Sequence, residues 1–237
     1  MIHMQQQKNG QPNKSRVANY LDFWAPILLT ILFYSGFRYF IAEARYIPSG
    51  SMLPGLQIND RLLVEKLTFK KRLPKRGEIV VFNSPHSFDE KLISQRQRKL
   101  PSSLKCALSS MPVLNAMPGV SDKACDAYIK RVVAVGGDAI SVNENGKLLV
   151  NGDRIEEPYI LNQCFSTMNG LTNCRPVKTF VPNGHVFVLG DNRSNSWDSR
   201  YWPGSHFLPV NEIIGRAVWR FWPIHRTGSL MLEDRNE

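Results

Sequence analysis

The feature that most constrains this chain is an apolar segment close to its N-terminus. Residues 23–37 (FWAPILLTILFYSGF) carry no charge, and the apolar character resumes after Arg38. The twenty residues 23–42 would make about 30 Å of α-helix, which matches the hydrocarbon core of a bilayer. Trp24 and Tyr39 lie near the two ends, where aromatic side chains favour the membrane–water interfaces. The segment therefore predicts a transmembrane helix in which Arg38 reaches the interface.

Two other kinds of segment share this composition, a cleavable signal peptide and a buried core helix. A signal peptide has a shorter apolar core followed by small residues at a cleavage site, whereas residues 45–48 here are RYIP. A core helix would pack against a second segment with helical periodicity, and the sequence shows none. Pro26 falls in the first turn of a helix that begins at residue 23, where its missing N–H costs little. We therefore interpret the segment as an uncleaved anchor.

The charges before the anchor predict its orientation. Lys8, Lys14 and Arg16 precede it, and only Asp22 opposes them. Positive residues favour the cytoplasmic side of a membrane, so we expect the N-terminal residues to lie there. The expected segments are a cytoplasmic tail (1–22), a transmembrane anchor (23–44) and an outer-side domain (45–237).

The cysteines fit a domain on the oxidising side of a membrane. All four, Cys106, Cys125, Cys164 and Cys174, follow the anchor. Zinc ligands are usually separated by roughly two to four residues, and no pair here has that spacing. An even number of cysteines in an oxidising compartment predicts disulfides, with three connectivities open. We expect sequence neighbours to pair, Cys106 with Cys125 and Cys164 with Cys174; four unpaired buried thiols are the alternative.

The net charge indicates a polyanionic partner. The chain has 30 Lys and Arg against 20 Asp and Glu, a net charge of +10. Residues 61–105 hold 12 basic and 4 acidic side chains, so they supply +8 (12 − 4) of that charge. Phe69, Phe82 and Phe88 are the only aromatic residues there, too few for a platform that stacks nucleic-acid bases. These residues could form a basic face that only contacts solvent. We expect instead that their partner is a bilayer with anionic lipids, and we do not expect a nucleic acid.

Beyond residue 55 the sequence shows short strands separated by turns. Asn145-Gly146 stands between the apolar triplets 140–142 and 148–150, a strong β-hairpin signal. Residues 84–124 are basic, rich in serine and weakly patterned, which indicates an insertion or long loop, and residues from about 139 to 186 indicate a compact subdomain. We therefore expect a mainly β fold built on an antiparallel sheet. The expected strands are 61–66, 78–82, 128–135, 140–142, 148–150, 186–189 and 217–221.

A serine-containing loop follows the anchor directly. Residues 46–55 (YIPSGSMLPG) place two serines around a glycine and between two prolines. Pro48 and Pro54 stiffen the backbone, and Gly50 permits a conformation that exposes Ser51. A serine hydroxyl becomes a nucleophile only beside a base. Since Ser-Gly-Ser is also common in turns, this loop alone indicates little.

A lysine can supply that base if burial removes its proton near neutral pH. Lys130 lies in the strand-like run 128–133 (YIKRVV). Because a strand alternates its faces, Lys130 and Arg131 are expected to point to opposite sides, one inward and the other to solvent. Two basic residues on an exposed edge strand are the alternative.

A third polar segment follows an apolar strand. Residues 190–202 (GDNRSNSWDSRYW) are too polar for a core element. Taken alone, they fit a loop stabilised by its own Asn and Asp side chains.

Together these segments resemble the bacterial type I signal peptidases. That family has a serine loop after a membrane anchor, then a Lys-Arg strand, then a loop of the form Gly-Asp-Asn-x-x-x-Ser-x-Asp-Ser-Arg. Residues 46–55, 128–133 and 190–200 match in this order, as do residues 76–82 (RGEIVVF), and the resemblance spans about residues 20–223. It implies a membrane-bound serine endopeptidase that removes N-terminal signal peptides from exported preproteins, cutting after a small-x-small motif. It also implies a single-pass protein of the bacterial inner membrane, with its catalytic domain on the periplasmic side.

The resemblance implies a role for each matching residue. Ser51 is the expected nucleophile and Lys130 the general base of a Ser/Lys dyad that forms an acyl-enzyme and needs no metal or other cofactor. Ser49 is expected to donate to the oxyanion beside the N–H of Ser51, and Ser196 to hydrogen-bond and orient the lysine. The residues expected to support the loop are Asp191, Asp198 and Arg200. The residues expected to line shallow apolar substrate pockets are Ile47, Pro48, Met52, Leu56, Tyr128 and Ile129.

Some features depart from the family pattern and keep alternatives open. The 84–124 insertion is unusually long, and residues 134–138 are Ala-Val-Gly-Gly-Asp, where a proline commonly precedes the Gly-Asp. A specialised peptidase of a conjugation or dedicated secretion system is one alternative, and an inactive anchored β-domain that binds partner proteins is another. A Ser/His/Asp hydrolase using His185 and Asp191 would lack the Gly-x-Ser-x-Gly elbow.

Overall fold

The computed structural model describes residues 16–96, 99, 101–102, 106, 123–160, 164 and 174–231, with the backbone alone for residues 16–21. The chain divides into two compact units, Met1–Ile41 and Ala42–Glu237. Residues 1–15 of the predicted tail and much of the predicted insertion lie outside the described residues.

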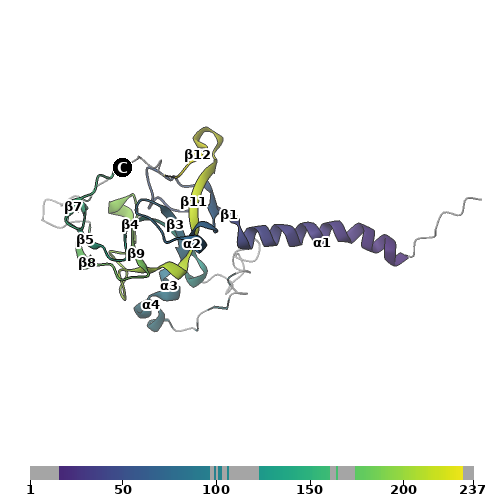
Figure 1. The fold of residues 1–237 in the computed structure, drawn as a ribbon, viewed down its shortest axis with the longest axis horizontal. Helices are drawn as coiled ribbons and strands as arrows, with labels where there is room; N and C mark the ends of the chain where they lie inside the picture. Colours follow the sequence, from purple (N-terminus) through teal and green to yellow (C-terminus); the bar gives the residue numbers. More distant parts are fainter. Residues whose placement is uncertain are drawn as a thin grey trace, which may run out of the picture. The chain divides into compact units, whose positions relative to one another are not determined.

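The first unit contains one long helix, α1 (Arg16–Phe40) (Figure 1). Its residues Asp22–Phe40 have a mean hydropathy of 1.2 and are long and apolar enough to cross a membrane. The helix begins earlier than the sequence pattern indicates, so Pro26 lies inside it rather than in its first turn. It also ends earlier: Ala42–Ala44, predicted as part of the anchor, lie in a strand, because this stretch pairs residue by residue with a second strand.

The second unit is built around an antiparallel sheet, as predicted, and this sheet has eight strands. The strand order is β1-β2-β11-β3-β4-β9-β10, and β12 pairs with β11. The strands are β1 (Ala42–Tyr46), β2 (Arg61–Glu65), β3 (Ile79–Asn83), β4 (Ala127–Val135), β9 (His185–Leu189), β10 (Leu208–Pro209), β11 (Ile213–Trp222) and β12 (Gly228–Ser229). Every strand expected for this sheet is present; β1, β10 and β12 were not expected.

Strand β4 has one edge that is only partly paired. On one side β3 pairs with it from Ala127 to Arg131. On the other side β9 pairs with it only from Arg131 to Val135. Among the described strands, none pairs with the second edge of residues 127–130.

A second antiparallel sheet has the order β7-β6-β5-β8. Its strands are β5 (Ala139–Val142), β6 (Leu148–Val150), β7 (Asp153–Arg154) and β8 (Val177–Phe180). The predicted β5–β6 hairpin is confirmed, and Gly146 has φ of +75°, a conformation that favours glycine. This sheet occupies the region predicted as a compact subdomain.

Three buried clusters form the core. One lies between β4, β9 and the second sheet and contains Phe187 and Leu189. The second lies on one face of the large sheet around Phe82 and Trp202. The third packs the serine loop onto the sheet through Met52 and Leu56.

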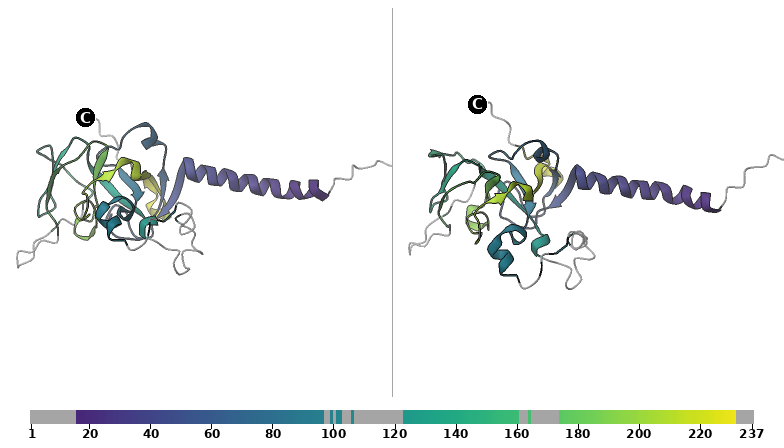
Figure 2. Two further views of the ribbon diagram at one scale, coloured as in Figure 1. Left: turned by 90° about the horizontal axis from the view of Figure 1, so that it is seen from below. Right: turned by 60° about the horizontal axis from the view of Figure 1, so that its bottom comes forward.

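The predicted insertion begins with two short helices, α3 (Pro85–Phe88) and α4 (Glu90–Ser94), which lie side by side (Figure 2). Another short helix, α2 (Thr68–Lys71), follows β2. The remaining elements are the 3-10 turns η1 (Lys123–Cys125), η2 (Arg193–Asn195), η3 (Val210–Glu212) and η4 (Ile224–Arg226). The expected disulfides, Cys106–Cys125 and Cys164–Cys174, are confirmed.

Candidate active site

The serine loop is held by its apolar residues, which leaves its polar ones outside. Ile47, Met52 and Leu56 are buried in the third core cluster. Ser49 is exposed and Ser51 is half-buried, with their Oγ atoms 3.5 Å apart. The loop therefore presents both hydroxyls at the surface of the sheet.

Lys130 meets Ser51 at this surface. Its side chain rises from β4 and is only 4% exposed. Its Nζ donates a hydrogen bond to Ser51 Oγ at 2.7 Å and another to the main-chain oxygen of Ile129 at 3.0 Å. The structure thus brings together the two residues predicted as the dyad, which are far apart in the sequence.

Burial also changes the proton affinity of this lysine. It lowers the pKa of Lys130 from its ordinary 10.5 to about 8, because the charged ammonium loses its hydration. The nearby Arg200 guanidinium adds to the decrease, while the carboxylates of Asp198 and Asp191 oppose it. A substantial fraction of Lys130 is therefore neutral at mildly alkaline pH and able to accept a proton.

Arg131 does not reach solvent, contrary to the expectation from strand alternation. Its side chain is buried and makes two hydrogen bonds to the Asp191 carboxylate, at 2.8 and 2.6 Å. The guanidinium lies 3.9 Å from the centroid of the Tyr159 ring, a cation–π contact. These partners come from distant segments, so both faces of β4 are covered at this point and both basic side chains are inside.

The loop after β9 packs against the back of the serine loop. Asn192 donates its main-chain N–H to the oxygen of Ser51 at 3.1 Å and its side-chain amide to the oxygen of Gly50 at 3.0 Å. Gly190 lies so close that a Cβ there would be 2.5 Å from the Ser51 oxygen. This contact explains why glycine begins the loop.

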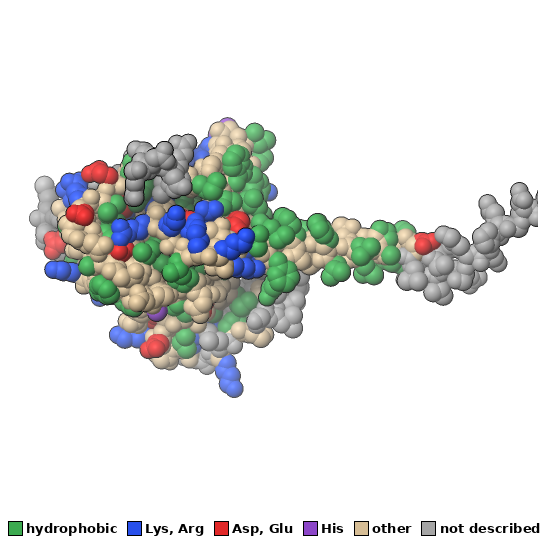
Figure 3. All heavy atoms as spheres, viewed as in Figure 1, with side chains coloured by type: hydrophobic (Ala, Val, Ile, Leu, Met, Phe, Trp, Pro, Cys, Tyr) green, Lys and Arg blue, Asp and Glu red, His purple; other side chains and the backbone are tan. Residues whose placement is uncertain are grey.

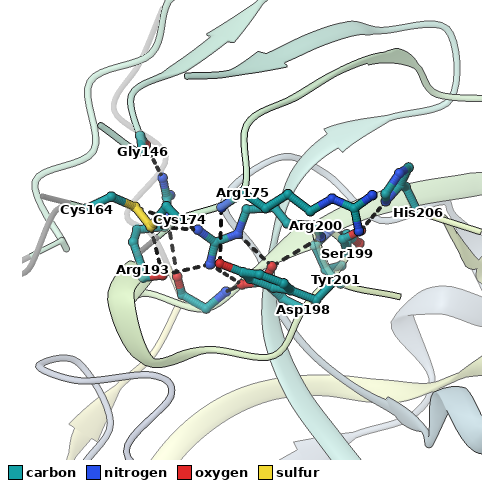
Figure 4. A network of polar contacts seen from close by, with 12 residues as sticks. Gly146, Cys164, Cys174, Arg175, Arg193, Asp198, Ser199, Arg200, Tyr201 and His206 are labelled. Atoms are coloured by element: carbon teal, nitrogen blue, oxygen red, sulfur yellow. Dashed lines mark hydrogen bonds and ion pairs between the residues drawn. A yellow bond between two sulfur atoms is a disulfide. The ribbon is translucent and has the colours of Figure 1, made fainter. Parts of the chain in front are cut away.

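A buried ion pair holds this loop in shape. Asp198 and Arg200 are both fully buried and share two hydrogen bonds of 2.8 Å. Asp198 also accepts the N–H of Gly190 at 3.0 Å, which connects the pair to the residues behind Ser51. Arg200 Nη1 lies 3.3 Å from Cys174 Sγ, so the Cys164–Cys174 disulfide packs against the guanidinium (Figure 4).

Arg193 extends the same network and was not predicted. Its side chain is 1% exposed, donates to the main-chain oxygens of Gly190 and Gly146, and forms an ion pair with Glu157. Figure 4 shows Arg193 beside the disulfide. The loop is therefore tied to the second sheet as well as to the serine loop.

Ser196 is close to the dyad but does not make the expected hydrogen bond. Its Oγ is buried, and no hydrogen-bond partner reaches it among the described residues. The atom instead packs on Gly190, where a Cβ would lie 2.2 Å away. The orienting role of Ser196 stays a prediction.

A cleft of about 530 Å³ opens beside the dyad. It is lined by Pro48, Ser49, Gly50, Ser51, Asp126, Ala127, Tyr128, Ile129, Lys130, Asn195 and Trp197. Pro48, Tyr128 and Ile129 thus line it as expected, whereas Ile47, Met52 and Leu56 do not and are 0–2% exposed in the core. The difference arises because the loop turns its apolar side chains under the serines, into the sheet.

Trp197 and Asn195 line the cleft without having been predicted. Trp197 occupies a variable position of the matched motif, so only its size and aromaticity hinted at a role. No group of three or more His, Cys, Asp or Glu side chains that would hold a metal occurs in the part of the chain that the structure describes.

Comparison with known proteins identifies the family. A family model described as "Signal peptidase, peptidase S26" matches residues 20–222. The chain belongs to the signal peptidase family S26. The probable signal peptidase I-2 of Synechocystis sp. is 37% identical over 89% of this chain and 77% of its own length.

Other members of the S26 family are similarly close. A signal peptidase I of Leptolyngbya laminosa is 38% identical over 85% of this chain and 79% of its own length. Thylakoidal processing peptidase 1 of Arabidopsis thaliana is 34% identical over 84% of this chain and 47% of its own length. The match covers the serine loop, β4 and the loop after β9, so the whole site lies within the family region.

Proposed function

We propose that this protein is a membrane-bound serine endopeptidase that removes N-terminal signal peptides from exported preproteins, cutting after a small-x-small motif. The observation that carries the proposal is the 2.7 Å hydrogen bond between Lys130 Nζ and Ser51 Oγ beside an open cleft. It occurs in a chain of the signal peptidase family, whose named relatives are processing peptidases.

The chemistry begins with neutral Lys130. It takes the proton of Ser51 Oγ while that oxygen forms a bond to the scissile carbonyl carbon. The Lys130 ammonium then gives the proton to the leaving amine as the C–N bond breaks, which leaves an acyl group on Ser51. Water loses a proton to Lys130, attacks the acyl carbon and releases the signal peptide with a new carboxylate; Ser51 regains its hydrogen.

The negative charge on the carbonyl oxygen needs donors during both steps. The Ser49 hydroxyl and the N–H of Ser51 are the groups that we assign to it. The exposed Ser49 Oγ, 3.5 Å from Ser51 Oγ, supports this assignment. Each donor of this kind is worth roughly 2.7–4 kcal/mol of transition-state stabilisation in other hydrolases.

The open edge of β4 supplies a place for the preprotein. Residues 127–130 lack a strand partner on the cleft side among the described elements, and Lys130 ends this open stretch. An extended peptide that pairs with this edge would carry its carbonyl past Ser51. Pro48 and Ile129 line the cleft beside Ser51, and we assign the two small side chains of the motif to them.

The membrane assignment rests on α1 and on an apolar face of the large sheet. We assign Asp22–Phe40 as the single span, with the N-terminus in the cytoplasm and the catalytic unit on the periplasmic side of the bacterial inner membrane. Trp219 (43% exposed), Trp222 (45%) and Ile224 (76%) on β11 and η4 leave large apolar side chains in solvent. Figure 3 shows hydrophobic side chains gathered over this end of the unit.

Anionic lipids are the partner that we assign to this face, and we assign no nucleic acid. Arg61 lies 5.8 Å from the Trp222 ring centroid, which pairs a cation with an interfacial aromatic residue. Vesicles containing brominated anionic lipids will quench the tryptophan fluorescence of the full chain more than that of the W219F/W222F variant. Equal quenching of the two proteins would contradict the contact.

The peptidase activity is tested with a secretory precursor and detergent-solubilised full chain. We expect one cut after a small-x-small motif, and no detectable cut by S51A or K130A. The exposed F180A variant, on β8 and outside the cleft, serves as the matched control and should cut like the wild type. Cleavage by S51A at the wild-type rate would refute the dyad.

A further inference from the structure

One aromatic residue in the cleft has no part in the dyad chemistry. Trp197 lines the same cleft as Ser51 and Lys130, and its side chain is 37% exposed. A tryptophan in a polar loop exposes a large apolar surface, which costs free energy unless something covers it. Its place in the cleft makes a bound peptide the natural cover.

The indole ring is held in place from two directions. It stacks on His86 of α3, with ring centroids 5.9 Å apart and an interplanar angle of 21°. On another side it meets Tyr128 of β4 at 5.8 Å. Both distances lie in the range of favourable aromatic pairs. The ring is therefore positioned before any substrate arrives.

The helices that carry His86 are themselves fixed to the catalytic loop. Ser84 caps α3 by accepting the N–H of His86. The buried carboxylate of Asp89, between α3 and α4, accepts the N–H groups of Gly204 and Ser205, which follow the loop that carries Trp197. The start of the 84–124 insertion thus supports one wall of the cleft.

Strand geometry indicates which substrate side chains meet this wall. Tyr128 and Ile129 lie on opposite faces of β4, and Trp197 contacts Tyr128. Ile129 packs instead with the cluster of Met52 and Leu56. An extended peptide beside β4 alternates in the same way, so the first and third residues before the cut share one face and the second and fourth share the other. Because Ile129 packs against the core cluster, we place the two small residues on its face, which leaves the second and fourth residues facing Trp197.

We propose that Trp197 is a specificity-determining residue: its ring contacts the second and fourth preprotein residues before the cut and favours large apolar or aromatic side chains there. This inference rests on the proposed function and assigns a preference to positions that a small-x-small rule leaves free. The binding free energy comes from burying the apolar surface of these substrate side chains against the Trp197 ring. Because His86 and Tyr128 already hold that ring in place, little conformational entropy is lost on binding.

The test uses detergent-solubilised full chain and fluorogenic small-x-small peptides. The second and fourth positions carry Ser, Leu or Phe in turn, and kcat/KM is measured for each. We expect the wild type to prefer Leu or Phe over Ser by about tenfold, as a gained apolar contact gives. W197A should cleave all peptides within about twofold of one another, so the preference disappears whatever its overall rate. W197F should retain most of the preference, and F180A all of it.

The outcomes separate this inference from the proposed function. If the wild type cuts no peptide at the small-x-small bond, the peptidase proposal fails. If the wild type cuts but shows no preference at these positions, or if W197A keeps the preference, the role of Trp197 is refuted. If W197A does not fold or cuts no peptide, the same rates are measured for H86A, which removes the ring that stacks on Trp197. We expect a reduced preference for Leu or Phe in H86A, and an unchanged preference contradicts the proposal.

Discussion

The main-chain oxygen of Ser51 accepts a hydrogen bond from the N–H of Asn192 at 3.1 Å. The same oxygen lies 2.5 Å from the place that a Cβ on Gly190 would occupy. The backbone of the proposed nucleophile is therefore located by a loop that follows a different strand. This loop in turn is held by the buried pair of Asp198 and Arg200.

The close approach of Gly190 predicts that G190A loses activity. Its new methyl group would overlap the Ser51 oxygen and the Ser196 hydroxyl, so the backbone at Ser51 must shift and the geometry of the dyad changes with it. A displacement of about 1 Å at reacting groups can cost about 100-fold in rate, and overpacking costs about 1–3 kcal/mol of stability. Peptide cleavage measures the kcat, with G228A as control, since a Cβ at Gly228 meets nothing within 4 Å. A wild-type kcat in G190A would show that the close approach of Gly190 to Ser51 is not needed to position the nucleophile.

The lowered pKa of Lys130 predicts the pH dependence of cleavage. Below a pH of about 8 the side chain is protonated and cannot accept the Ser51 proton, so kcat/KM should rise about tenfold per pH unit up to that point and then level off. The measurement is kcat/KM between pH 5.5 and 10 on one peptide. A profile that is flat from pH 6 to 9 would exclude Lys130 as the titrating base.

The same pKa predicts how stability changes with pH. The unfolded chain holds its proton up to about pH 10.5 and the folded chain only up to about 8, so the wild type loses stability as the pH falls from 10.5 to 8 and loses no more below that. K130M cannot be charged and escapes this loss. Its advantage in stability over the wild type should grow to roughly 3 kcal/mol at pH 8 and below, and disappear above pH 10.5. Melting temperatures across this range check the result, and a constant difference between the two proteins would contradict it.

The Cys164–Cys174 disulfide, which packs on Arg200, is expected to affect kcat, whereas the Cys106–Cys125 disulfide is not. The C164S/C174S variant lacks this disulfide, and we expect its free energy of unfolding to fall by about 2–3 kcal/mol because the loop is no longer closed. It also removes the sulfur that packs on the guanidinium at 3.3 Å, so kcat should fall severalfold as the loop behind Ser51 loosens.

The second disulfide supplies the control for this experiment. C106S/C125S should lower the melting temperature at least as much, because its sequence separation of 19 exceeds the 10 of the other disulfide. The Arg200 guanidinium packs on the sulfurs of Cys164 and Cys174, which this variant keeps, so kcat should stay near the wild-type value. Equal losses of kcat in the two variants would show that the packing on Arg200 has no specific effect.

Local patterns in the sequence were sufficient for the longer strands and the hairpin, and the family resemblance supplied the dyad pair. The hairpin at Asn145-Gly146 and the strand around Lys130 are formed by neighbouring residues, and the serine loop is marked by its prolines. Ser51 and Lys130 were paired through the family resemblance and the need for a desolvated base, and the structure places them 2.7 Å apart.

Features that depend on distant partners were not predictable in this way. Arg131 is buried because Asp191 and Tyr159 reach it from other segments, and alternation along one strand cannot reveal them. The loop residues Met52 and Leu56 were assigned to the cleft, but an apolar side chain in a loop can serve either the core or a substrate. The wall formed by Trp197 and His86 joins two segments whose sequences carry no common pattern.

The half-paired β4 has a consequence for which precursors are vulnerable. Backbone N–H and C=O groups on a strand edge pair with any extended chain, whatever its amino-acid sequence. This edge therefore selects a precursor by its conformation. A junction that is already folded into a helix, or packed in a domain, cannot form that ladder even with a suitable small-x-small sequence. The cleavage rate would then depend on the free energy needed to unfold the cleavage junction into an extended strand. Precursors whose mature domain folds around the junction would be processed more slowly.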